Sequence, residues 1–367
     1  MISLISFAFL SSTLIIYNKM IKKILIISFL LFSFIFPLDI WITIDKSQQD
    51  NVVPIFKKFF PNSNLSIFYW EDALPKMISK IKRQDLPDII LTGHTYVPFI
   101  ATHYSKFSRV DPLFWDIRAL YVWGNKEYMP INNWSEIINY IQSHTNFISF
   151  PTKWDPNSFY NYLSFFNDQL PFWISQTPFT VQNMLYTTNL LATLKRGYPS
   201  VFRDNPTKSF LSQETSSIIA GLWMYNILKF RQEQFTVYPV PKSQNGIAEF
   251  KGAYVGILFN DTSDTLKALE LLNSYDFQQK IWIPLNLLPS NKKLQSTLKA
   301  DPVLTKLIEI SNSSRWATSI EPDILTNRIE VLNYLLQKPD LLKNFNEKKL
   351  RKFFNNKLYF NIMKLIK

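Results

Sequence analysis

Residues 38–44 read LDIWITI and residues 86–91 read LPDIIL. Each holds a short apolar run rich in β-branched side chains, which predicts a buried strand. Between them, residues 52–60 and 74–83 carry apolar side chains at helical spacing, and residues 65–69 form another β-rich run. Strands that alternate with helices predict βαβ units and a largely parallel sheet. This stretch therefore predicts an α/β fold.

The same alternation continues through the rest of the chain. With 367 residues, of which 47% are hydrophobic, the protein exceeds the usual size of one domain, so we expect two lobes. No repeat or low-complexity linker separates them, which predicts short crossings. The further predicted helices are 134–142, 158–167, 181–196, 265–275, 277–282, 302–311 and 324–337, and the further strands or extended segments are 147–150, 217–220, 238–241 and 254–259.

The residue types exclude several kinds of active site. The chain has no cysteine, which excludes disulfides, thiolate metal sites, cysteine nucleophiles and a lipid-bearing cysteine. Its three histidines are His94, His103 and His144, and none forms a zinc-helix motif. No phosphate-binding loop, dinucleotide fingerprint or nucleophile elbow is present. Glu71 and Asp72 could imitate a glycosidase acid, but nothing locates the second carboxylate. We expect no enzyme activity, no cofactor and no metal.

The N-terminal residues 1–37 have the pattern of an export signal. Three lysines between positions 19 and 23 precede the apolar run 24–36, which is short for a membrane span of about 20 residues. The small residues of a cleavage site are missing around 33–38, so the segment is a cleaved signal, an uncleaved anchor or a core helix. Either of the first two places the rest of the chain outside the cytoplasm. Met20 and Met1 are alternative starts.

The net charge of +12 is concentrated near the C-terminus. Residues 343–367 hold eight Lys or Arg and one acid. A solvated helical tail explains such a run, and attraction to an anionic membrane surface is the alternative. No nucleic-acid recognition motif accompanies the charge, so we expect no nucleic-acid partner.

Six sequence pieces, in this order, resemble the family 1 extracellular solute-binding proteins, which include maltose-binding protein. None of the pieces is specific alone, and together they span most of residues 38–340. They are IWITIDK (40–46), LPDII (86–90), ALYVWGNK (119–126) with NWSEI (133–137), the segment 210–223 ending in AGLW, YPVP (238–241) with GAY (252–254), and 268–280 with LLPS (287–290).

The resemblance implies a periplasmic-binding-protein type II fold, with two doubly wound lobes, a hinge and a central cleft. Residues 38–117 plus 256–300 would form lobe 1, and residues 118–255 plus 301–367 would form lobe 2. The segment between Asp88 and Trp134 is shorter than is usual in the family, which changes one wall of the cleft.

The implied function is the extracytoplasmic substrate-binding component of an ABC importer. Such a protein, expected as a monomer, captures a sugar or oligosaccharide and delivers it to the transmembrane subunits of the permease. One alternative is the same fold with another polar or anionic solute, such as a sugar phosphate or a polyamine. The other is a membrane-anchored scaffold that has lost binding.

Candidate ligand contacts follow the strands of lobe 1, because ligands of open α/β sheets bind outside the carboxyl ends of the strands. Asp45 and Lys46 follow the first strand and could accept from and donate to sugar hydroxyls, unless they form a surface pair. Thr92, His94 and Tyr96 end or follow the third strand and offer polar edges. For His94, a purely structural role is the alternative.

Arg118 occupies the place where the crossing strand of this family often carries a ligand contact. A buried guanidinium matches a carboxylate or phosphate, so an inward Arg118 would favour an acidic ligand. An Arg118 on the surface would not indicate an acidic ligand.

Tryptophan rings suit the C–H faces of sugars, and the chain has 10 Trp. Trp154, Trp223 and Trp316 lie in predicted loops or at element ends and are the candidates. Trp223 is the best supported, because it lies in the AGLW segment of the resemblance; the other two have core or rim positions as the alternative. Three others are predicted in the core: Trp41, Trp134 and Trp282.

Overall fold

The structure is a computed structural model that describes residues 37–104, 106–124, 132–154, 158, 161–162, 165, 190–242, 250–316, 332–334 and 336–337. The predicted export segment, the basic tail and most of the helices predicted at 158–167, 181–196 and 324–337 lie outside these residues. Within the described ranges, no helix combines the length and the apolarity needed to cross a membrane.

Three parallel strands form the start of the sheet, as predicted. β1 (Asp39–Ile44) lies between β2 (Asn64–Tyr69) and β3 (Ile89–Gly93). The connections are α2 (Gln49–Phe59) and α3 (Ala73–Lys82), which confirms the two βαβ units.

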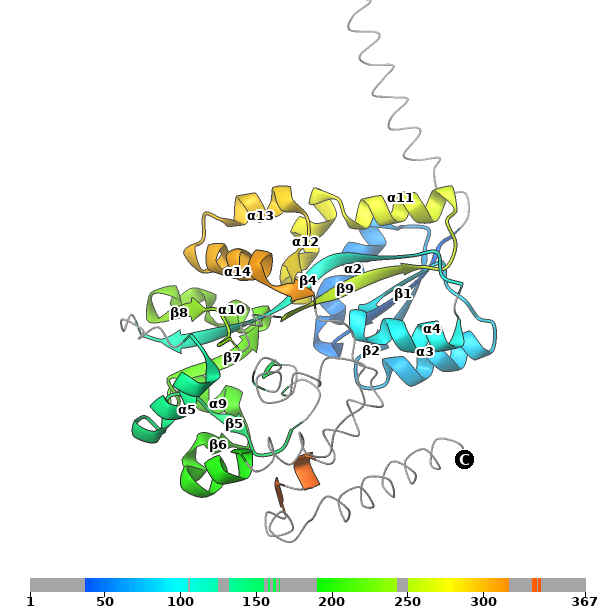
Figure 1. The fold of residues 1–367 in the computed structure, drawn as a ribbon. Coiled ribbons are helices and arrows are strands. Elements are labelled where there is room, and N and C mark those ends of the chain that lie inside the picture. The colour runs from blue at the N-terminus through cyan, green and yellow to red at the C-terminus, as the bar shows by residue number, and fades with distance from the viewer. Residues whose placement is uncertain are drawn as a thin grey trace, which may run out of the picture.

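The remainder of the sheet is mixed, so the prediction of a largely parallel sheet was wrong. β9 (Phe250–Leu258) runs antiparallel to β3, and β4 (Arg109–Trp123) runs antiparallel to β9. The strand order is β10-β4-β9-β3-β1-β2, where β10 is Leu288–Pro289. The antiparallel pairing arises because β4 leaves for the second group of elements and β9 returns from it (Figure 1).

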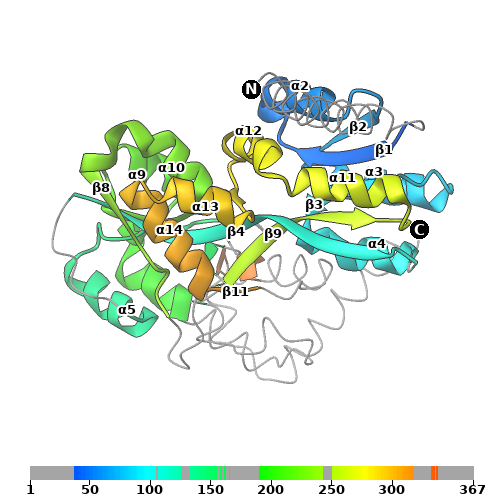
Figure 2. The same ribbon diagram turned by 90° about the horizontal axis from the view of Figure 1, so that it is seen from above.

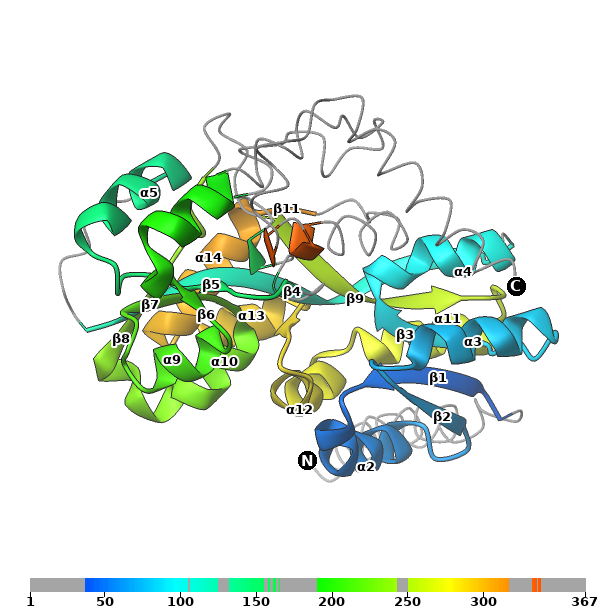
Figure 3. The same cartoon turned by 90° about the horizontal axis from the view of Figure 1, so that it is seen from below.

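Helices cover both faces of this sheet. α2, α11 (Ser263–Leu272) and α12 (Tyr275–Leu285) pack on one face, where Phe56 meets Phe277 edge to face. α3 and α4 (Val97–His103) cover the other face, as Figures 2 and 3 show from above and below. This two-sided cover makes the first lobe doubly wound.

The second lobe is built on the far half of β4. There β4 pairs with β7 (Ser217–Gly221) and β8 (Phe235–Tyr238). β4 changes partner within one step, since Ile117 lies opposite Lys251 of β9 and Arg118 lies opposite Gly221 of β7. β4 therefore runs from the first lobe into the second, and the first residues of β9 lie beside the point where β4 changes partner.

Alternate side chains of β7 belong to two clusters, one shared with the helix that starts at Leu222 and the other with the helix that starts at Trp134. α5 (Trp134–Ser143) is capped by Asn133, whose side chain accepts from the Glu136 N–H. β5 (Phe150–Pro151) starts at the last residue of the strand predicted at 147–150.

The remaining elements of the molecule are β6 (Phe202–Arg203), α9 (Pro206–Leu211), α10 (Leu222–Leu228), α13 (Lys292–Leu298), α14 (Pro302–Ser313), β11 (Arg315–Trp316) and the 3-10 turns η1 (Lys46–Gln48), η2 (His94–Tyr96), η3 (Pro199–Val201) and η4 (Lys229–Gln234).

One hydrophobic cluster runs through both lobes. It joins α2, α11 and α12 of the first lobe to α10 and α14, which pack against β4 and its partner strands in the second lobe. A separate cluster fills the second lobe around Trp134. Trp41, Trp134 and Trp282 are all buried, which confirms that these three belong to the core.

Candidate functional site

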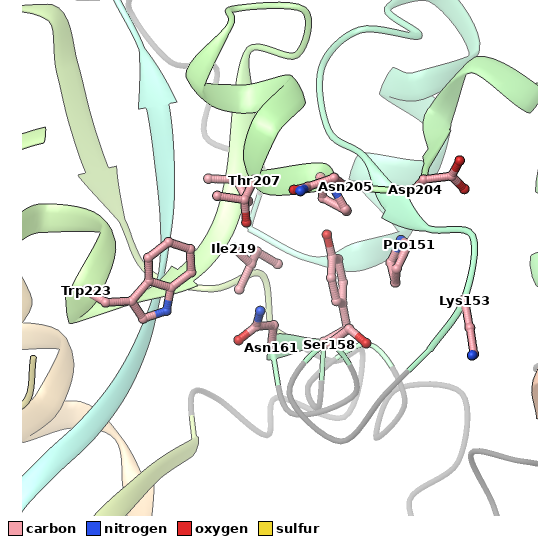
Figure 4. A pocket seen from close by; sticks show the side chains of 12 residues that line it. Pro151, Lys153, Ser158, Asn161, Asp204, Asn205, Thr207, Ile219 and Trp223 are labelled. Atoms are coloured by element: carbon pink, nitrogen blue, oxygen red, sulfur yellow. The ribbon is translucent and has the colours of Figure 1, made fainter. Parts of the chain in front are cut away.

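A cavity of ≈ 260 Å³ opens on the second lobe. Its wall combines the indole of Trp223 with amide, hydroxyl and charged side chains, and Figure 4 shows these side chains arranged around a common space. The lining residues are Pro151, Lys153, Ser158, Asn161, Tyr162, Asp204, Asn205, Pro206, Thr207, Ile218, Ile219 and Trp223.

Trp223 reaches this cavity because α10 begins directly after β7. Gly221 is the N-cap of α10, and Trp223 lies in the first turn of the helix. A Cβ atom on Gly221 would lie 3.0 Å from Cδ1 of Trp223 and 3.0 Å from Nη1 of Arg118. Glycine therefore permits both side chains to pack against the end of β7.

Arg118 points inward, and its charge is already compensated. Its side chain is 11% exposed and forms an ion pair with Asp116 through Nη1. Nε donates to Oδ1 of Asn161 over 2.6 Å. Because a carboxylate of the protein neutralises the guanidinium, the inward position does not carry the argument for an acidic ligand that the sequence suggested.

The far wall of the cavity is formed where β6 leads into α9. Asn205 caps this helix by accepting from the Lys208 N–H over 2.9 Å. Asp204 accepts a hydrogen bond from Thr152. With Lys153 the described lining has one cation and one anion, so its formal charge is balanced.

The carboxyl ends of the first-lobe strands present an aromatic group. Trp70, just after β2, meets the rings of Tyr96 and Tyr254 edge to face, at centroid distances of 5.5 and 6.4 Å. The Tyr96 hydroxyl donates to the Trp70 carbonyl over 3.3 Å. Gly93 again permits close approach, since a Cβ there would lie 3.2 Å from Cη2 of Trp70.

Two carboxylates accompany this group. Partial burial of the carboxyl group, and then the charge of Glu71, raises the pKa of Asp45. The same two causes raise the pKa of Tyr96 to about 12. Asp45 and Lys46 are exposed at the end of β1, so their side chains can reach a ligand outside the strands. The structure thus brings Asp45, Lys46 and Tyr96 to one edge of the sheet.

Thr92 and His94 are placed differently. Thr92 is fully buried, and its hydroxyl has no hydrogen-bond partner among the described residues. His94 is also buried, and its Nδ1 lies 3.1 Å from the Ala253 nitrogen. Burial is the largest cause that lowers the pKa of His94, and nearby Asp116 and Arg118 act in opposite directions. This arrangement fits the structural role given above as the alternative for His94.

Of the other two candidate tryptophans, Trp154 is described and is not among the residues that line the cavity. Trp154 is 1% exposed and packs on Tyr162 with ring centroids 5.4 Å apart. It belongs to the core of the second lobe, where its ring also packs near that of Phe150. Trp316 pairs through its backbone with Lys251 of β9, and its side chain lies outside the described part of the chain.

Sequence reasoning missed most of the polar cavity wall, including Lys153, Asn161, Asp204, Asn205 and Thr207. One signal was available, because Asp204-Asn205-Pro206 is a helix-cap pattern of the kind that follows the carboxyl end of a strand. In the described ranges, no group of three or more His, Asp or Glu side chains lies close enough together to hold a metal ion.

Comparison of sequences gives no relative: no family model matches the chain, and no curated protein matches it. Comparison of structures gives many. The GacH receptor of Streptomyces glaucescens GLA.O, known unliganded and with acarbose, is similar at a TM-score of 0.65 and 14% identity, over 87% of this chain and 98% of that one.

Two further neighbours have similar coverage. The maltose-maltodextrin binding protein of Alicyclobacillus acidocaldarius has a TM-score of 0.61 and 12% identity, over 88% of this chain and 100% of its own. An ABC transporter solute-binding protein of Thermotoga lettingae TMO, bound to α-D-tagatose, has a TM-score of 0.57 and 13% identity, over 88% of this chain and 98% of its own. At these identities the likeness concerns the fold, and the protein therefore has the type II periplasmic-binding-protein fold of the maltose-binding-protein-like solute-binding proteins.

Proposed function

We propose that this protein is the extracytoplasmic substrate-binding component of an ABC importer, and that it captures a sugar or oligosaccharide between its lobes. The observation that carries the proposal is the cavity beside Trp223, on a fold shared with solute-binding proteins. In this account the protein is a binding protein and not an enzyme.

The composition of the cavity wall supports a sugar. An indole offers an apolar face to the C–H surface of a sugar ring, while its edge stays polar. Around Trp223 stand the amides of Asn161 and Asn205 and the hydroxyls of Ser158 and Thr207, which can donate to or accept from sugar hydroxyls. An apolar face with a few convergent polar groups is the usual composition of a small-ligand site.

The first lobe supplies the opposite half of the proposed site. Asp45, Lys46 and Tyr96 lie where the strands of that lobe end, beside the ring of Trp70. We propose that the lobes close on the ligand by bending about β4 and β9, with the boundaries 38–117 plus 256–300 and 118–255 plus 301–367. The change of partner along β4 at Ile117 and Arg118 supports the first of these boundaries.

The permease would recognise the closed form. A ligand that binds the closed state more tightly shifts the population toward it. We propose a monomer at the outer face of the cytoplasmic membrane or in the periplasm. Residues 1–37 would act there as a signal or an anchor.

The charges of the site separate the rival ligands. Arg118 is paired with Asp116, and Lys153 and Asp204 both line the cavity. A sugar phosphate requires uncompensated cations and a polyamine requires uncompensated carboxylates, so the balanced lining favours a neutral solute. Asp45 and Glu71 are the features that favour a polyamine as the second candidate.

A thermal-shift screen tests the proposal. The purified protein is scanned against mono- and oligosaccharides, sugar phosphates, polyamines and amino acids. A ligand at 100 times its dissociation constant stabilises the folded state by about 2.7 kcal/mol. We expect stabilisation by one class of neutral sugar. Stabilisation only by a polyamine or an anion would overturn the sugar assignment, and no shift at all would favour a scaffold.

A further inference from the structure

We propose that Arg118 fixes the side-chain amide of Asn161 so that Asn161 presents its NH₂ group, and not its oxygen, to the ligand. Arg118 is then a positioning residue, and Asn161 selects a ligand atom that accepts a hydrogen bond. The inference rests on the proposed function and deepens it, because it states which chemical group of the solute must face one wall of the cavity.

The orientation follows from one contact. Nε–H of Arg118 donates to Oδ1 of Asn161 over 2.6 Å. An amide oxygen held in this way leaves the nitrogen of the same amide on the opposite side. Asn161 lines the cavity, and in the view of Figure 4 its nitrogen points toward the space beside Trp223. Among the described residues, none accepts a hydrogen bond from that nitrogen.

The amide is not free to turn over. Rotation by half a turn would place the Asn161 NH₂ group against the Arg118 Nε–H, so that two donors would face each other at hydrogen-bond distance. A guanidinium is always charged and has no acceptor, so it cannot adapt to the flipped amide. The hydrogen bond to a charged donor therefore selects a single orientation.

Arg118 itself is held from two other sides. Its Nη1 is paired with Asp116, two residues earlier on β4. The same Nη1 lies against the end of β7, where a Cβ on Gly221 would come within 3.0 Å of it. With the side chain 11% exposed, the guanidinium has little room to move away from Asn161.

The consequence concerns ligand chemistry. A hydroxyl, a ring oxygen or a carbonyl of the solute can accept from the Asn161 NH₂ group, whereas an ammonium group cannot. A site that holds a buried donor discriminates against a ligand that leaves the donor unpaired. Asn161 thus favours neutral, oxygen-rich solutes over amino sugars and polyamines at this position of the ligand.

The test uses Asn161→Asp, which keeps the shape and the contact with Arg118 but replaces the donor by an acceptor. The probes are maltose and two series of maltose analogues, in each of which a single hydroxyl is replaced. The replacement is fluorine in the first series and an ammonium group in the second. At one ring position we expect the wild type to bind the fluoro analogue at least about tenfold more tightly than the ammonium analogue, and Asn161→Asp to reverse that order.

Two variants separate orientation from charge. Asn205→Asp adds the same negative charge to the same cavity, and Asp remains a good helix cap, so it should shift all ammonium analogues together without a reversal. Arg118→Met frees the Asn161 amide, so the preference between the two analogues should shrink toward unity while maltose still binds. If Asn161→Asp changes every analogue by a common factor, Asn161 is not an oriented donor and the inference is wrong.

A ligand-free measurement keeps the inference separate from the function. In the wild type the Arg118 Nε–H signal, observed by NMR, should exchange slowly with water, and the protection should be lost in Asn161→Leu and kept in Asn161→Asp. Fast exchange in the folded wild type would refute the fixed amide. Slow exchange without any binding of maltose would support the orientation and remove the proposed ligand class.

Discussion

Arg118 and Trp223 meet at the same glycine: Nη1 of Arg118 and Cδ1 of Trp223 each lie 3.0 Å from the position of a Cβ on Gly221. A Cβ contact of 3.0 Å is tighter than nearly all that proteins contain, so a neighbour would have to shift, and one neighbour is a ring while the other is held in an ion pair. The glycine thus couples the strand that crosses between the lobes to the aromatic wall of the cavity.

Gly221→Ala should weaken ligand binding by about tenfold, because the added methyl group displaces Trp223 from the cavity wall or Arg118 from Asn161. Titration calorimetry with the sugar that stabilises the wild type measures the change. Gly197→Ala is the matched control, since a Cβ at Gly197 meets nothing within 4 Å. Equal affinities of the two variants would show that the close packing at Gly221 has no part in binding.

Replacing Trp134 and replacing Trp223 should have different effects on stability. Trp134 is fully buried among Phe150, Tyr162 and Phe165, so Trp134→Ala should lower the free energy of unfolding by about 3–5 kcal/mol. Trp223 is only partly buried, and its truncation should lower the stability much less. Chemical denaturation of both variants checks the difference. Similar losses would place Trp223 in the core.

Asp45→Asn should raise the melting temperature at pH 7. Burial and the charge of Glu71 raise the pKa of Asp45 above 3.8, so the native state binds more protons than the unfolded state and stability falls as pH rises from that value. The Asp45→Asn variant does not lose stability in this way, so its higher melting temperature relative to the wild type should disappear below pH 3.8. Melting curves between pH 3 and pH 8 measure it. Glu71→Gln should reproduce part of the effect by removing one cause, and a lower melting temperature for Asp45→Asn at pH 7 would contradict the account.

His94→Gln should make the stability less dependent on pH between 7 and 5. Burial lowers the pKa of His94 below 6.5, so the unfolded state binds the proton first and the wild type loses stability as pH falls through that value. Glutamine has no such titration, and it can still form a hydrogen bond with the Ala253 backbone. Denaturant unfolding at several pH values gives the slope. An unchanged slope would mean that His94 does not contribute to it.

The sequence predicts the first lobe well because the order of elements there is a local property. Apolar periodicity locates β1, β2, β3, α2 and α3, and a helical crossover between consecutive strands makes those strands run parallel. It does not give the direction of β9 and β4, since their pairing joins residues more than a hundred positions apart, such as Val110 and Ile257. Such contacts leave no local pattern.

The candidate site could likewise be predicted only in part from the sequence. Asp45, Lys46 and Tyr96 could be proposed from one rule, because they follow strands at the carboxyl edge of the sheet. Trp154 satisfied a similar rule but lies in the core. The position of a residue in a loop does not determine the direction in which its side chain points. Asn161 could not be found, since its orientation depends on Arg118, 43 residues away.

The most direct test of the central claim is calorimetric titration of the wild type and of Trp223→Ala with the sugar that gives the largest thermal shift. The account predicts one binding site in the wild type and about 10- to 100-fold weaker binding in Trp223→Ala, because truncation removes an aromatic surface whose burial contributes about 1.5–3 kcal/mol. Unchanged affinity in a folded Trp223→Ala variant would contradict the placement of the ligand in this cavity.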